Sequence, residues 1–243
     1  GNFDGDDILD ILLKEKQTAL YITRKMYRFF VNEQVDEKRV QWLADRFYKS
    51  DYEIKTVLND IFTSDWFYEE KNIGTRVKSP VDLLVGIRRS MPMQIENEDA
   101  QLFLQKVLGQ ILFYPPNVAG WPGGFNWIDS SSLMFRMRIP QLMANKEAFQ
   151  FKAKNDDDQE MGRAGRMPGR VVNTTIQWEQ AFKQLEKVQR EQLLSNVAAL
   201  VWQTDAAKLN KAMVEKFVDA SSRDRYIQTS IIQLMCTPEY QMC

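Results

Sequence analysis

The sequence contains no histidine among its 243 residues. Imidazole is the usual general base near neutral pH and a frequent ligand of zinc and iron. The chain therefore cannot build a Ser-His-Asp or Cys-His catalytic device from its own residues, nor a histidine-ligated metal site. Acid–base chemistry would have to use carboxylates, lysine, tyrosine or cysteine. We expect no metal site and no cofactor, and the absence of imidazole favours a chain that is not catalytic alone.

Cysteine is almost absent as well, with only Cys236 and Cys243 near the C-terminal end. Two thiols are too few for a disulfide framework or for a structural zinc site. They either form one bridge, if the last helix frays there, or remain free. The sequence favours free thiols, because cysteine is often buried as a small apolar residue.

The sequence also lacks an excess of charge and any long hydrophobic run. Its 32 basic and 33 acidic side chains leave a net charge of -1, so no overall attraction to nucleic acid is expected. No apolar run approaches the roughly 20 residues that cross a bilayer, so we expect no transmembrane segment. The length is sufficient to bury a sizeable core.

Helical periodicity and helix-start signals dominate what is present. Asp4 and Asp36 stand where they can cap helices, and Ser50 with Glu53 has the spacing of a capping box. Ser79-Pro80 with Asp82 forms a strong start signal. No segment alternates with period two, so no strand is predicted. We predict an all-α fold, an irregular bundle of about ten helices with a long Pro/Gly/Trp loop, as one domain over residues 1–243. The expected helices span residues 4–13, 18–31, 36–47, 50–62, 80–90, 98–113, 175–188, 190–202, 206–218 and 222–236. A further helix is expected to begin at residues 130–132, and Pro140 could bend it.

Residues 152–170 break the helical pattern with a run of aspartates followed by a Gly/Arg-rich segment. Low apolar content and cancelling charges predict a flexible internal surface loop. The three arginines of its second half could grip a phosphate. Without a phosphate-binding glycine pattern, that alternative is the weaker one.

The loop from Pro115 to Asp129 is rich in proline, glycine and tryptophan and is the best candidate site. Flat tryptophan faces beside short polar groups suit a sugar ring or an extended peptide, and an arginine in the next helix could meet an anionic group. The candidate ligand-binding residues are Asn117, Trp121, Asn126, Trp127, Asp129 and Arg136. The alternative is a structural corner in which both tryptophans fill the core, and buried aromatics are the commoner case.

Two further functions come from different classes. Asp82 and Asp129 could act as the paired carboxylates of a hydrolase, which needs no histidine, with the site completed elsewhere. Alternatively, the aromatic residues 66–68 could form a partner surface for assembly. They could equally pack against a missing N-terminal half of the same protein, since the chain opens at a helix start without a signal peptide.

Several strings resemble one known family, the bacterial domain of unknown function numbered 1800. The most specific is PPNVAGWPGG, residues 115–124, followed by Trp127. The opening GNFDGDDILDILL, the segment RKMYRFFV at residues 24–31 and VKSPVD at residues 77–82 occur in the order found in that family. The resemblance covers residues 1–132 well, and the TPEYQ string near the C-terminal end adds to it.

The resemblance implies that this chain is the C-terminal half of a longer protein. Family members often carry export signals, which implies an envelope or extracellular setting. The family has no established biochemical activity, so no catalytic residue carries over. The resulting hypothesis is an exported helical binding or scaffold module with a carbohydrate or peptide site at the loop from Pro115 to Asp129.

Overall fold

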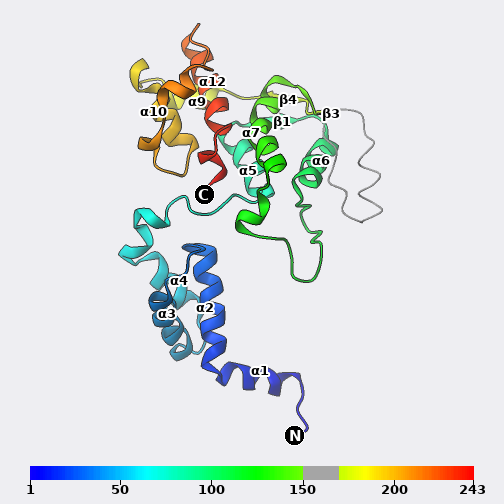
Figure 1. Ribbon diagram of the computed structural model, residues 1–243, viewed down its shortest axis with the longest axis vertical. Coiled ribbons are helices and arrows are strands. Elements are labelled where there is room, and N and C mark those ends of the chain that lie inside the picture. Colours follow the sequence, from blue (N-terminus) through cyan, green and yellow to red (C-terminus); the bar gives the residue numbers. More distant parts are fainter. Residues whose placement is uncertain (150–169) are drawn as a thin grey trace. The chain divides into compact units, whose positions relative to one another are not determined.

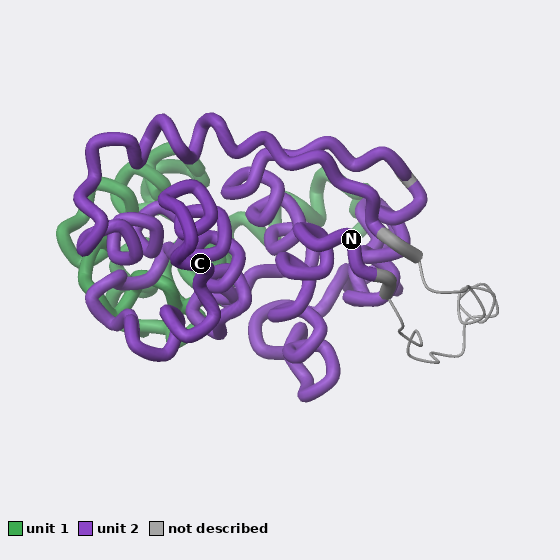
Figure 2. The backbone as a smooth tube through the Cα atoms, turned by 90° about the horizontal axis from the view of Figure 1, so that it is seen from above, with its two compact units in different colours: residues 1–76 green, residues 77–243 purple. Residues whose placement is uncertain are grey.

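The computed structural model describes residues 1–149 and 170–243, and this part of the chain is mostly helical (Figure 1). It contains eleven α-helices, which confirms the predicted all-α, multi-helix fold. The chain divides into two compact units, Gly1–Arg76 and Val77–Cys243 (Figure 2). A single domain over residues 1–243 stays a prediction. The predicted flexible loop at residues 152–170 lies outside the described residues, except for its last residue.

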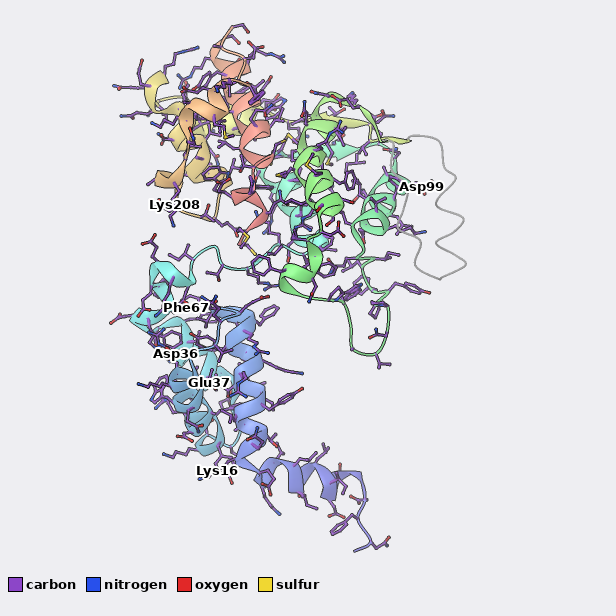
Figure 3. All side chains as sticks on the ribbon, in the orientation of Figure 1. Lys16, Asp36, Glu37, Phe67, Asp99 and Lys208 are labelled. Carbon is purple, nitrogen blue, oxygen red and sulfur yellow. The ribbon has the colours of Figure 1, made fainter. Side chains whose placement is uncertain are left out.

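The first unit is a small helical bundle. Asp4 caps the first helix and forms a capping box with Asp7. Asp36 caps the third helix, whose first residue is Glu37; both residues are labelled in Figure 3. Both caps confirm the start signals read in the sequence. The elements are α1 (Gly5–Lys14), α2 (Lys16–Phe30), α3 (Glu37–Lys49), α4 (Ile54–Phe62), η1 (Asp65–Tyr68) and η2 (Glu70–Asn72).

Helix α4 begins later than predicted. One bond of the capping box expected at Ser50 forms, since the Ser50 hydroxyl accepts a hydrogen bond from Glu53 N at 3.2 Å. Ser50 is nevertheless not the cap, because the helix begins at Ile54 and the Glu53 side chain caps it by accepting a bond from Lys55 N. Asp51 and Tyr52 have φ values of 55° and 61°, which no helical turn contains. The Tyr52 hydroxyl donates to the carbonyl of Leu13 at 2.7 Å. This bond fixes the α3–α4 turn against the end of α1.

Helices α2, α3 and α4 share the core of the first unit. Its fully buried members include Tyr27, Leu43 and Phe47. Trp66 stacks on Tyr27 with ring centroids 6.0 Å apart, and Phe67 is half-buried beside it, as labelled in Figure 3. The aromatics at 66–68 are therefore mainly internal packing, and only the third of them is exposed.

The second unit carries the remaining elements, including four short strands. Its helices are α5 (Pro80–Ser90), α6 (Glu98–Leu108), α7 (Ser130–Asn145), α9 (Glu179–Leu185), α10 (Arg190–Val201), α11 (Lys211–Glu215) and α12 (Arg223–Met235). Its single-turn helices are η3 (Gly124–Trp127), η4 (Ala206–Lys208) and η5 (Glu239–Gln241). Its strands are β1 (Met93–Ile95), β2 (Ala148–Phe149), β3 (Arg170–Val171) and β4 (Thr174–Ile176).

The strands correct the expectation that the chain has none. β1 pairs antiparallel with β4, Met93 opposite Ile176, and β2 pairs antiparallel with β3. Strands of two or three residues are too short to show an alternating pattern. The helix predicted at residues 175–188 is wrong in its first part for the same reason, since Thr175 pairs with Gln94.

Two helices end or divide at positions that the apolar pattern did not mark. The helix predicted at residues 98–113 ends at Leu108, because Gly109 adopts a left-handed φ of 85° and closes it. The segment predicted as one helix at residues 206–218 contains η4 and α11. Asn210 caps α11 by accepting a hydrogen bond from Met213 N, which starts a new helix there.

The core of the second unit joins α5, α6, α7, α10 and α12. Trp202 at the end of α10 donates its indole N–H to the carbonyl of Leu234 at 3.0 Å, which ties α10 to α12. Cys236 and Cys243 are free thiols, as the sequence favours. In the part of the chain that the structure describes, no helix is long and apolar enough to span a membrane.

Candidate functional site

The loop between α6 and α7, residues 109–129, extends away from the helices that it joins (Figure 1). Its first end is fastened by two glutamine side chains. Gln105 Oε1 accepts a hydrogen bond from Leu112 N at 2.8 Å, and Gln110 Oε1 accepts one from Val81 N at 2.9 Å. These bonds join the start of the loop to α6 and α5.

The second end of the loop is fastened by a helix cap. The Asp129 carboxylate accepts a hydrogen bond from Ser132 N, and the Ser132 hydroxyl accepts one from Asp129 N, both at 2.8 Å. This capping box begins α7. A loop held at both ends can present its middle in a defined position.

The middle of the loop displays large apolar side chains to solvent. Phe113 is 89% exposed, Tyr114 61% and Phe125 67%, while Val118 is fully exposed. Large apolar side chains that gather in solvent mark interaction surfaces more often than isolated ones do. We call residues 112–125 the apolar loop.

Phe113 owes its position to an unfavourable backbone conformation. Its φ is 64°, in the left-handed region that residues with a Cβ rarely adopt. Tyr114 N donates to the carbonyl of Ile111 at 3.0 Å, so the chain reverses tightly around Phe113. Such strain costs on the order of 1 kcal/mol and persists where the surroundings impose it.

The structure places the predicted polar residues of the loop in different roles. Asn117 Oδ1 accepts a hydrogen bond from Ala119 N at 2.8 Å, and its carbonyl accepts one from Gly120 N. Asn117 therefore stabilises a turn. Asn126 is exposed, and Asp129 is the helix cap of α7. Ligand contact by these residues stays a prediction.

The two tryptophans of the loop differ in burial. Trp127, at the end of η3, is only 8% exposed, whereas Trp121 is half-buried. The Trp127 carbonyl accepts a hydrogen bond from the Ser132 hydroxyl at 3.2 Å, which links η3 to α7. The burial of Trp127 agrees with the structural alternative for this residue.

The carboxylates considered for a hydrolase both belong to capping boxes at helix starts. Asp82 accepts hydrogen bonds from the backbone N–H and the hydroxyl of Ser79 at the start of α5. Asp129 is itself the N-cap residue of α7, whereas Asp82 is the third residue of α5 and bonds back to the cap residue Ser79. Neither position supplies an observation that favours the two-carboxylate chemistry.

Arg136 lies in the core of the second unit and is fully buried. Its Nη2 donates to the carbonyl of Lys78, and its Nε donates to Gln241 Oε1 at 3.1 Å. Its Nη1 has no hydrogen-bond partner among the described residues. These bonds fasten the C-terminal segment and the start of α5 to α7.

Lys78 is the second buried cation of this cluster. Its Nζ donates to the carbonyl of Tyr240 at 2.7 Å and stands 3.7 Å from the centre of that ring. Burial lowers the pKa of Lys78 to about 8 and the pKa of Arg136 to about 10.

The lowered pKa of Lys78 predicts a pH-dependent stability. Between about pH 8 and pH 10.5 the unfolded chain keeps a proton that the folded chain has lost. The free energy of unfolding should therefore rise with pH across this window, by on the order of 2 kcal/mol. Urea unfolding of the wild type and of Lys78→Met at pH 8 and pH 10 measures this contribution.

The comparison with Lys78→Met is needed because other groups titrate as well. Arg136, with its pKa lowered to about 10, acts in the same sense as Lys78 near pH 10, and two further groups act in the opposite sense. Burial raises the pKa of Cys236 to about 11 and also raises that of the Tyr240 hydroxyl. Both lower stability as the pH rises above 9 or 10. A difference between the two proteins that stays constant from pH 8 to pH 10 would show that Lys78 is not the titrating group.

The exposed apolar residues of the loop, Phe113, Tyr114, Val118 and Phe125, were not among the predicted site residues. The available signal was the run Leu112 to Tyr114, which continues the apolar composition of α6 beyond Gly109. If these residues continued the helix, as the sequence predicted, their apolar side chains would be expected to face the core. Only the helix end at Leu108 turns them into a solvent-facing surface.

In residues 1–149 and 170–243, no three Cys, Asp or Glu side chains come together as a metal site. The family model described as Protein of unknown function (DUF1800) matches residues 1–242. No curated protein and no solved structure gives a significant match to the chain.

Proposed function

The chain belongs to the DUF1800 family of proteins of unknown function, and from that premise we propose that it is a helical binding module. Its contact surface is the apolar loop, residues 112–125, and its ligand is a peptide or protein segment. The observation that carries this proposal is the exposure of Phe113, Tyr114, Val118 and Phe125 on a loop fastened at both ends.

The fastening matters because binding costs entropy when a loop must be ordered. A loop already held by Gln105 and Asp129 loses less freedom when a partner covers it. Exposed aromatic residues are also the side chains that contribute most to protein interfaces, tyrosine in particular. Their burial by a partner would remove unfavourable apolar surface from water.

A peptide fits this surface better than a sugar does. Sugar recognition needs polar groups that are free to bond hydroxyls beside a flat ring. Here the Asn117 side chain completes a turn and Asp129 caps a helix. The most exposed rings are two phenylalanines, which offer no hydrogen bond.

Binding of peptides and of sugars can be compared directly. A random peptide library displayed on phage and an array of glycans are presented to the purified chain. We expect peptides with several apolar residues to be enriched and to bind with micromolar affinity when synthesised. Binding of glycans but of no peptide would overturn the proposed ligand class. Failure of both would overturn the binding function of the loop.

We also propose that the protein acts outside the cytoplasm, which rests on the family resemblance. Fractionation of cells that produce the full-length protein tests this setting. Recovery from the envelope or the medium is expected, and confinement to the cytoplasm would contradict it.

A further inference from the structure

A concave site lies in the second unit, between α5 and α6. It is a pocket of about 180 Å³ whose walls are mostly aliphatic side chains. The wall residues include Leu84, Val85, Ile95, Leu104, Leu112 and Met143. An apolar cavity of about 150 Å³ is enough to hold a benzene-sized group. This pocket can therefore hold an apolar group of about six carbons.

Arg88 stands where this pocket meets a second, more polar depression. The depression has a volume of about 390 Å³, and Arg88, Arg89, Gln94 and Gln177 are among its lining residues. Val85 and Arg88 line both spaces, so the two adjoin along α5. The composite site is apolar at one end and cationic at the other.

The two arginines keep their charges available. Arg88 Nη1 donates to the neutral side chain of Gln101 at 3.1 Å. Within the described residues, neither Arg88 nor Arg89 forms an ion pair with a carboxylate. The other arginines of the second unit include Arg225, which is neutralised by Asp219, and the core residue Arg136.

We propose that the composite site binds an organic carboxylate with an apolar chain of about six to eight carbons. The apolar chain of the ligand lies between Leu84 and Leu104, and its carboxylate lies at Arg88 and Arg89. A guanidinium offers parallel N–H donors that match the two oxygens of a carboxylate. The aliphatic walls disfavour a sugar or a nucleotide base, because polar groups buried there would lack partners. This inference does not depend on the proposed function of the apolar loop.

Three probes separate the contributions of the two ends. Isothermal titration with octanoate, octanol and acetate measures binding to the chain at pH 7. Octanoate should bind at least tenfold more tightly than octanol and acetate, because only octanoate uses both ends. Equal affinity for octanoate and octanol would overturn the carboxylate role of the arginines. No binding of octanoate at millimolar concentration would overturn the site itself.

Variants then assign the contacts. Arg88→Gln combined with Arg89→Gln should weaken octanoate binding roughly tenfold and leave octanol binding unchanged. Arg138→Gln is the matched control, because Arg138 is an exposed arginine of α7 that lines neither space, and its affinity should equal that of the wild type. Val85→Trp, at the exposed junction, should block both octanoate and octanol. Unchanged octanoate binding in either the double variant or Val85→Trp would contradict the proposal.

Discussion

Replacement of Trp127 by alanine is expected to lower the free energy of unfolding by about 3–5 kcal/mol, the usual cost of removing a buried tryptophan. The side chain is only 8% exposed at the junction of η3 and α7. Its removal takes away a large apolar contact and leaves a cavity where the end of the loop is fastened. Urea unfolding at pH 7, followed by circular dichroism, gives the free energy directly.

Trp121→Ala is the internal control for this measurement. Trp121 belongs to the same loop but is half-buried, so its replacement should cost about 1–2 kcal/mol. A Trp127→Ala variant with wild-type stability would contradict the structural role of Trp127. If Trp127→Ala and Trp121→Ala lower the free energy of unfolding equally, the deeper burial of Trp127 adds no stability.

Replacement of Phe125 by aspartate should have the largest effect on binding. A large aromatic side chain that a partner buries can contribute about 2 kcal/mol or more, so peptide affinity should fall roughly 30-fold or further. Because the ring is 67% exposed in the free chain, the free energy of unfolding should change by less than about 0.5 kcal/mol. Fluorescence anisotropy with a labelled, library-selected peptide measures the affinity.

Phe217 supplies a closely matched control. It is 66% exposed, lies in the same unit and is outside the apolar loop. Phe217→Asp introduces the same charge at a side chain of equal exposure and should leave peptide affinity unchanged. Equal losses of affinity in Phe125→Asp and Phe217→Asp would indicate a nonspecific effect of charge rather than contact by the loop.

Helix starts were predictable because capping is local. Asp4 with Asp7, and Ser79 with Asp82, satisfy backbone N–H groups three residues apart, so their signals are complete in the sequence. The Ser50 signal failed for a nonlocal reason. The Tyr52 hydroxyl bonds to the carbonyl of Leu13, and this contact accompanies a backbone turn that a helix cannot contain.

Burial of polar groups was not predictable in the same way. Arg136 follows a loop of small and aromatic residues and carries no sign of its environment in the sequence. Its burial depends on Lys78 and Gln241, which are far from it along the chain. A guanidinium can be held in a core only when distant carbonyl oxygens meet it, and only the folded structure shows them.

The candidate site was likewise predictable only in its local features. The Pro/Gly/Trp composition correctly indicated an irregular segment between two helices. Which aromatic residues face solvent depended on where α6 ends and on the left-handed conformation of Phe113. The exposed rings are therefore Phe113, Tyr114 and Phe125, while Trp127 is buried.

Hydrogen exchange of the chain with and without the library-selected peptide tests the central claim most directly. If the apolar loop is the contact surface, the amides of residues 112–125 should exchange more slowly in the complex. Amides of α10 and α12 should be unchanged. Protection confined to other parts of the chain, with residues 112–125 exchanging as in the free protein, would contradict the account.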